Sequence, residues 1–128
     1  MEFIGESFIK KSMVKYLTTH SWTNIGLEVR ILRFTHSDTH QKVNLYAEKD
    51  GKTILIECKG DSRRRRNAIQ DLYIVFGQAF YLLGSTEEVG IAIPHYWHKN
   101  LIEKNIFSKI LRQPIKVFLV SEDKVQEY

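Results

Sequence analysis

The spacing of apolar residues along the chain predicts alternating helices and strands. Apolar side chains recur at three- and four-residue intervals from Glu6 to about Thr19, which is typical of an amphipathic helix. Apolar and charged residues alternate over 25–34, as expected for a half-buried strand, and the polar stretch 35–41 indicates a loop. Further strands are predicted over 42–49, 52–59, 89–94 and 115–120.

Two more helices complete the predicted order. One is long and apolar on more than one face; it begins at Asp61 or Ser62 and ends near Leu83, before Gly84. The other spans about 95–112. These elements predict a mixed α/β fold in a single domain over residues 1–128.

The dipeptide Asp50-Gly51 predicts a hairpin, because both residues of a type I′ turn need a positive φ. A two-residue turn at this point places Asn44 opposite Glu57, with side chains on one face of the sheet. The alternation of side chains then places Leu55, Glu57 and Lys59 on that face. Ile54, Ile56 and Cys58 form an apolar core face on the other side.

This hairpin carries residues suited to metal-assisted hydrolysis of a phosphodiester. Carboxylates hold Mg²⁺ while the ion keeps several waters, and a nearby lysine can orient a water or offset charge on the phosphate. The backbone carbonyl of Cys58 is a further candidate ligand. Most Glu-x-Lys pairs on strands are solvated pairs on an exposed face. Here the apolar run before Glu57, the following Gly60 and the arginine-rich stretch after it favour a site.

Composition narrows the class of protein. The chain is 43% hydrophobic and 27% charged, as in an average globular protein, and has no apolar run long enough to span a bilayer. Its start does not resemble a signal peptide, and the single Cys58 excludes a disulfide framework and suits a reducing cytosol. We therefore expect a cytoplasmic protein.

The distribution of positive charge points to an anionic partner. The net charge is +4, and one unbroken arginine block consists of Arg63, Arg64, Arg65 and Arg66. Because this block follows the predicted site closely, it predicts contacts with nucleic-acid phosphates. The alternative is a solvated helix end.

Residues 43–60, VNLYAEKDGKTILIECKG, resemble the catalytic hairpin of the restriction-endonuclease-like PD-(D/E)XK nucleases. They look most similar to the small archaeal Holliday junction resolvase and Mrr-like branch. The resemblance implies an αβββαβ core with a mixed central sheet flanked by helices, plus a C-terminal helix and strand. It also implies a Mg²⁺- or Mn²⁺-dependent endonuclease that acts on DNA, with branched or junction DNA as the substrate, and a homodimer. Neither a membrane nor a small-molecule cofactor is expected.

The resemblance assigns roles to individual residues. Glu57 is a metal-binding acid and Lys59 the catalytic lysine. Glu6 resembles an acid that many members direct at the metal from the first helix. Gln78 resembles a glutamine placed near the active site in some branches; the alternative is that it satisfies a buried carbonyl.

Asn44 departs from the family pattern, because it stands where the family has a metal-binding aspartate. An amide oxygen can still ligate a cation but lacks the full negative charge. Three explanations stay open: an engineered inactive variant, a natural relative that has lost cleavage, or a replacement carboxylate from Asp38. The competing function is a catalytically inactive DNA-binding or assembly subunit that retains the fold.

Overall fold

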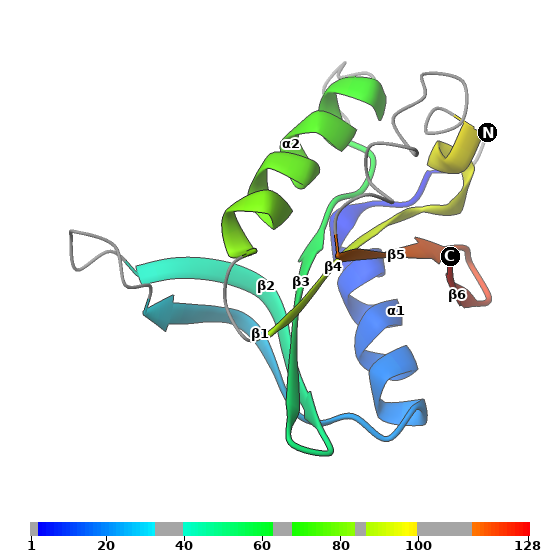
Figure 1. Ribbon diagram of the computed structural model, residues 1–128. Coiled ribbons are helices and arrows are strands. Elements are labelled where there is room, and N and C mark those ends of the chain that lie inside the picture. The colour runs from blue at the N-terminus through cyan, green and yellow to red at the C-terminus, as the bar shows by residue number, and fades with distance from the viewer. Residues whose placement is uncertain (1–2, 33–39, 63–67, 84–86, 100–113) are drawn as a thin grey trace.

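A six-stranded mixed sheet with helices on both faces forms the centre of the fold in this computed structural model (Figure 1). The structure describes residues 3–32, 40–62, 68–83, 87–99 and 114–128. The elements are α1 (Glu6–Thr19), β1 (Thr23–Leu32), β2 (His40–Lys49), β3 (Lys52–Cys58), α2 (Ala68–Leu82), β4 (Glu88–Pro94), η1 (His95–Trp97), β5 (Ile115–Val120) and β6 (Val125–Glu127). The predicted mixed α/β class is confirmed.

The strands lie side by side in their order along the chain, from β1 to β6. β3, β4 and β5 are parallel to one another, whereas β1, β2 and β6 join the sheet through antiparallel pairs. Parallel strands need a crossover between them, and α2 lies between β3 and β4 in the chain. The parallel centre is therefore covered on both sides, as such sheets usually are.

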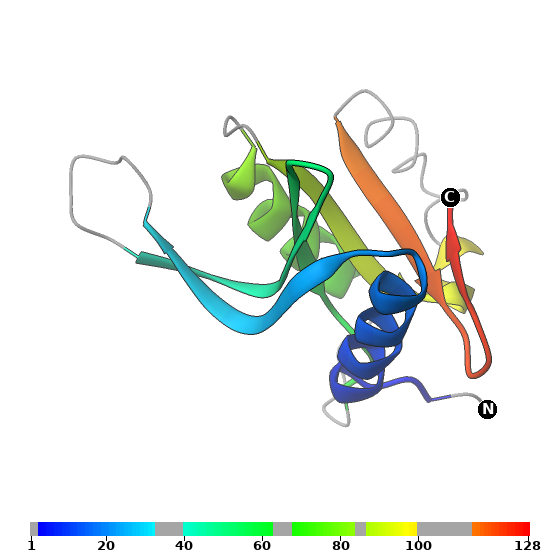
Figure 2. The ribbon, with the colours of Figure 1, turned by 90° about the horizontal axis from the view of Figure 1, so that it is seen from below.

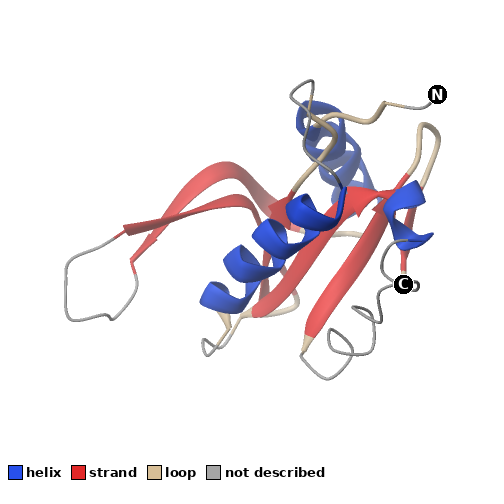
Figure 3. Cartoon of the chain, turned by 90° about the horizontal axis from the view of Figure 1, so that it is seen from above, coloured by secondary structure: helices blue, strands red, loops and turns tan. Residues whose placement is uncertain are grey.

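Each helix covers its own face of the sheet (Figure 3). The buried side of α1 packs with Ile54, Ile56 and Cys58 of β3, while Leu55 packs with the buried side of α2. This division confirms the alternation predicted for β3. It also leaves Glu57 as the one carboxylate within a strand of otherwise apolar, buried neighbours.

The Asp50-Gly51 turn and its register are as predicted. Both residues have a positive φ, +51° and +77°. The ladder between β2 and β3 runs from the pair Lys49–Lys52 to the pair Leu45–Ile56. Asn44, the next residue of β2, bonds through its side chain to the backbone of Cys58 instead of extending the ladder.

Several predicted boundaries are wrong. The strand expected over 25–34 begins at Thr23, its predicted end at 34 lies outside the described residues, and His40 and Gln41 belong to β2 rather than to a loop. The predicted start of the second helix lies outside the described residues, which resume at Ala68, and the Asp61 carboxylate accepts hydrogen bonds from Ile4 and Trp97. The sequence pattern did not predict β6.

Some predictions fall on segments outside the described residues. Most of the helix expected over 95–112 is among them; its described part is the short η1 and the two residues after it. The single residues concerned are Asp38, Gly84 and the whole arginine block, Arg63, Arg64, Arg65 and Arg66. The phosphate contacts predicted for these four arginines therefore stay a prediction.

No helix in the described part of the chain is both long and apolar enough to cross a membrane.

Candidate active site

Glu57 lies near the carboxyl end of β3, paired with Ile91 of the parallel strand β4. The residue is only 4% exposed. No other described residue donates a hydrogen bond to its carboxyl group. Burial, then the negative charges of Glu28 and Glu6, raises its pKa from the ordinary 4.5 to about 7, and Lys10 opposes this. A buried carboxyl group with no hydrogen-bond donor is costly to ionise and is suited to gain a cation.

The start of α1 is fastened to the end of β3 by a close backbone contact. A Cβ on Gly60 would lie 2.4 Å from the Glu6 nitrogen, so only glycine fits. The Asp61 N–H donates to the Ile4 carbonyl at 2.8 Å, and its carboxylate accepts from the Ile4 N–H at 3.2 Å. This packing brings Glu6 to the strand end that carries Glu57 and Lys59.

Glu28 brings another carboxylate to the same place from β1. The pairs Leu27–Leu45 and Val29–Val43 flank it in the ladder, so Glu28 lies opposite Asn44. Its φ is +54°, in the left-handed region that residues other than glycine seldom adopt. The strands β1 and β2 bend along their length and extend away from the rest of the molecule (Figure 2). Glu28 and Asn44 lie in the middle of these strands.

The amide of Asn44 connects Glu28 to β3. Its Oδ1 accepts the Cys58 N–H at 2.8 Å, and its Nδ2 donates to the two carboxylate oxygens of Glu28 at 3.3 and 3.4 Å. Both ends of the amide are therefore occupied. The sequence predicted Asn44 as the cross-strand partner of Glu57, but the ladder ends at Leu45–Ile56 and the Asn44 side chain bonds to the Cys58 backbone instead.

Lys10 of α1 balances part of the negative charge. Its ammonium contacts Glu6 at 2.9 Å and Glu28 still more closely, while Lys42 reaches Glu28 at 3.4 Å. Burial disfavours the Lys10 ammonium, but hydrogen bonds to Glu28 and Glu6 outweigh it and raise the pKa of Lys10. Burial likewise works against ionised Glu28, yet its bonds with Lys10, Lys42 and Asn44 lower its pKa. The pKa of Glu28 is thus lowered, while the pKa of Glu57 is raised to about 7.

The remaining predicted residues are placed as follows. Lys59 is half-buried beyond the end of β3, its N–H donates to Ala92, and its ammonium pairs with no other described residue. The Cys58 thiol is buried, which raises its pKa and leaves it protonated, as expected for a core residue. Gln78 lies exposed on α2, so it does not satisfy a buried carbonyl, and no hydrogen bond links it to Glu57 or Lys59.

The donor set fits a hard divalent cation in its chemistry. Carboxylates from α1, β1 and β3 supply oxygen ligands of the kind Mg²⁺ prefers. Among the described residues, no three His, Cys, Asp or Glu side chains already surround a point where a metal would fit. Mg²⁺ does not need such a cage, because one or two carboxylates together with substrate phosphates usually hold it. Glu57 with one neighbouring carboxylate meets that requirement.

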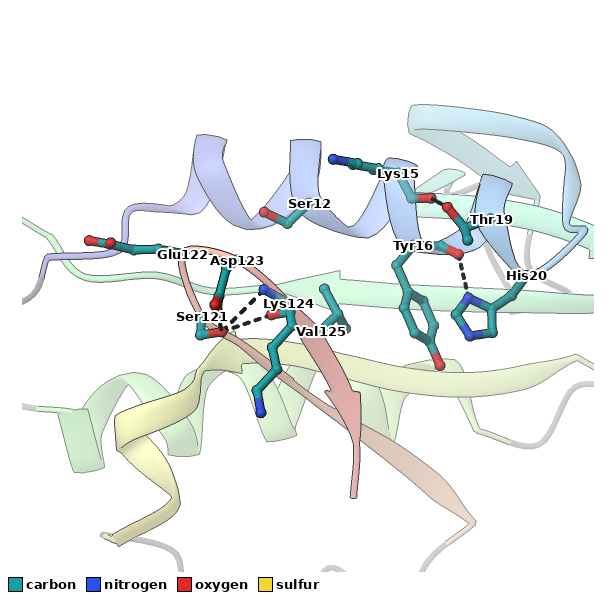
Figure 4. Close-up of a pocket in the computed structure, with 10 residues that line it drawn as sticks. All are labelled: Ser12, Lys15, Tyr16, Thr19, His20, Ser121, Glu122, Asp123, Lys124 and Val125. Carbon is teal, nitrogen blue, oxygen red and sulfur yellow. Dashed lines mark hydrogen bonds between the residues drawn. The ribbon is translucent and has the colours of Figure 1, made fainter.

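A separate cavity of about 200 Å³ lies between the second half of α1 and the β5–β6 turn (Figure 4). Hydrogen bonds within the turn join Ser121 to Asp123 and Lys124. Two lysines and two acids line the cavity, so its charges balance. It holds none of the predicted site residues, and nothing in its chemistry selects a ligand.

No protein-family model matches the sequence, and no curated protein matches it. Two solved structures are similar to the chain. One is an fdxN element excision controlling factor protein from Anabaena variabilis, with a TM-score of 0.70 and 16% identity, over 93% of this chain and 96% of that one. These proteins share a fold.

The other is Can2 from Sulfobacillus thermosulfidooxidans, whose structure was solved in complex with cyclic tetra-adenylate. Its TM-score is 0.54 at 14% identity, and the match covers 88% of this chain and 30% of the Can2 chain. The fold of this chain therefore corresponds to a part of Can2.

Two residues of the site were missed by the sequence analysis, Glu28 and Lys10. The alternation in β1 marks Glu28 only as one of several charged residues on an outward face. Lys10 follows Glu6 by four residues, a spacing that predicts an ion pair on a helix but not contact with a strand. Neither position carried a local signal for the site.

Proposed function

We propose that the chain is a metal-dependent endonuclease that hydrolyses phosphodiester bonds in DNA. The observation that carries this proposal is the setting of Glu57. It is a buried carboxyl group without a hydrogen-bond donor among the described residues. The negative charges of Glu28 on β1 and Glu6 on α1 contribute to its raised pKa. Two residues later comes a lysine with no described partner. A purely structural Glu-x-Lys pair would be solvated or joined in an ion pair.

In this proposal the acidic residues bind the metal ion and the lysines compensate negative charge. Glu57 and a neighbouring carboxylate would hold Mg²⁺ or Mn²⁺, and the Cys58 carbonyl is a further candidate ligand. When bound, such an ion polarises the phosphodiester and makes a coordinated water more acidic. Lys59 would offset the charge that develops on the phosphate. Lys10 contacts Glu6 and Glu28 directly and helps to lower the pKa of Glu28.

DNA as the partner follows from the basic sequence and from the resemblance described above. The arginine block 63–66 continues the chain a few residues after Lys59, so phosphate contacts there would lie close in sequence to the site. The Anabaena protein of the same fold is named for the control of excision of the fdxN element. Branched DNA is the substrate we propose to test first.

The test is a nicking assay with Mg²⁺ or Mn²⁺ on junction, flap and linear DNA. We expect the native chain to cut at least one substrate, and both Glu57→Gln and Lys59→Met to lower the rate by about 100-fold or more. Glu48→Gln, on the same hairpin, serves as the control because Glu48 bonds to Tyr46 and Asn24 away from the site. Cleavage that survives Glu57→Gln would contradict the proposal.

The second candidate function is a DNA-binding subunit that does not cleave. The neutral amide at Asn44, with both ends occupied, is the observation that favours it. If the native chain binds DNA without cutting while Asn44→Asp gains metal-dependent cleavage, the native chain is a nuclease that has lost its acid. If neither chain cuts any substrate, the binding function stands alone.

A further inference from the structure

A carboxylate lies beside Asn44 on the neighbouring strand. Glu28 lies opposite Asn44 in the ladder between β1 and β2, and its oxygens are 3.3 and 3.4 Å from the Asn44 Nδ2. We propose that Glu28 is the second carboxylate of the cation site beside Glu57, and that Asn44 is a positioning residue that holds Glu28 there. This inference rests on the function proposed above and names a residue which that proposal leaves open.

The side chain of Asn44 joins the Glu28 carboxylate to the backbone next to Glu57. The N–H that Asn44 accepts belongs to Cys58, and it is therefore part of the peptide unit that follows Glu57. From there, a single amide side chain spans the distance to Glu28. The amide thus ties the Glu28 carboxylate of β1 to the backbone of β3 at the residue after Glu57.

The same contacts explain why residue 44 is an asparagine. The Cys58 N–H needs an acceptor and the Glu28 carboxylate needs a donor, and an amide offers one at each end. Aspartate at this position would still accept from Cys58 but would turn an oxygen toward the Glu28 carboxylate. Glu28 and Asn44 therefore form a hydrogen-bonded pair, with the acid on β1 and the neutral amide on β2.

The buried carboxyl group of Glu57 is the independent sign that a cation belongs here. It is 4% exposed and no other described residue donates a hydrogen bond to it. Glu28 has a left-handed backbone, which is strained for a residue with a side chain, and such strain is common at functional sites. Lys10 and Lys42 contact Glu28 directly, and Lys10 also contacts Glu6.

Lys10 is then a competitor of the metal. Its ammonium contacts Glu6 and Glu28 together, where a divalent cation would gain from the same two negative charges. Removing the Lys10 ammonium should make the carboxylates of Glu6 and Glu28 more available to a divalent cation. Loss of Lys10 and loss of Glu28 are therefore expected to change metal affinity in opposite directions.

The test is calorimetric titration of the DNA-free chain with MnCl₂. We expect Glu28→Gln to weaken Mn²⁺ binding by about tenfold or more. The exchange variant Glu28→Gln/Asn44→Asp, which moves the carboxylate from β1 to β2, should recover most of the affinity. Glu48→Gln, which also removes one carboxylate from the hairpin region, is the control and should bind as the native chain does.

A second readout does not depend on Glu28→Gln folding well. Lys10→Met should raise the Mn²⁺ affinity severalfold, whereas Lys11→Met, on the exposed side of the same helical turn, should leave it unchanged. If Lys10→Met weakens binding or leaves it unchanged, Glu28 is not a ligand. The same conclusion follows if Glu28→Gln binds Mn²⁺ like the native chain while Glu57→Gln does not. If Glu57→Gln also binds like the native chain, the proposed function fails together with this inference.

Discussion

The buried carboxyl group of Glu57 predicts an unusual dependence of stability on pH. Its pKa is about 7 in the folded chain, compared with the ordinary 4.5 that we expect after unfolding. Between these values the folded chain holds a proton that the unfolded chain has lost, so stability falls as the pH rises. Below pH 4.5 both states are protonated, and above pH 7 the loss is complete.

The size of the effect follows from the distance between the two pKa values. Each pH unit corresponds to about 1.4 kcal/mol, so the ionised carboxylate costs the metal-free fold about 3 kcal/mol above pH 7. Glu57→Gln keeps the shape but cannot ionise. It should therefore be more stable than the native chain by about 3 kcal/mol at pH 8.5, which is about 10 °C in Tm for a domain of this size.

The assay is thermal unfolding of both chains in EDTA, at several values between pH 4 and pH 8.5. We expect the two Tm values to coincide near pH 4 and to separate as the pH rises through 4.5 to 7. Glu48→Gln is the control of opposite sign, because hydrogen bonds from Tyr46 and Asn24 lower the pKa of Glu48. A difference in Tm that does not change with pH, or a Glu57→Gln chain that is less stable at pH 8.5, would refute the reasoning.

Three further predictions concern the frame of the site and its partners. Gly60→Ala should destabilise the chain by about 1–3 kcal/mol, since its Cβ would meet backbone atoms at 2.4 Å, whereas Gly77→Ala on the open side of α2 should not; thermal unfolding compares them. Neutralising Arg64 and Arg65 should weaken the salt dependence of duplex DNA binding. The slope of log affinity against log salt concentration should become shallower by roughly 0.9 for each phosphate contact that is lost. An unchanged slope would mean that the arginine block is a solvated segment. The candidate interface of the expected homodimer is the uncharged face of α2, where Tyr73 and Tyr81 are 61% and 64% exposed. Replacing both tyrosines with glutamate should yield monomers in analytical sedimentation.

Local patterns sufficed for the elements whose form depends on nearby residues. The bounds of α1 follow from its apolar spacing, and the turn at Asp50-Gly51 follows from the need for two positive φ angles. This turn sets the register that brings Asn44 to the Glu57–Cys58 peptide. The two-residue turn determines the pairing from Lys49–Lys52 to Leu45–Ile56 because the ladder between them is regular.

The rest of the site depends on contacts between distant segments. Alternation gives no reason for Glu28 to adopt a left-handed backbone, and its role appears only once β1 lies beside β2 and α1. The position of Glu6 depends on the close approach of Gly60, 54 residues further along the chain. For Gln78, the motif indicated a place near the active site, and the structure presents it to solvent on α2.

The most direct test of the proposed function is the single-turnover cleavage of a labelled junction DNA by the native chain and by Glu57→Gln, each with Mg²⁺ and with EDTA. The geometry predicts cleavage by the native chain in Mg²⁺ alone, and none by Glu57→Gln in either condition. Equal cleavage by both chains in Mg²⁺ would show that the buried carboxylate is not part of the active site.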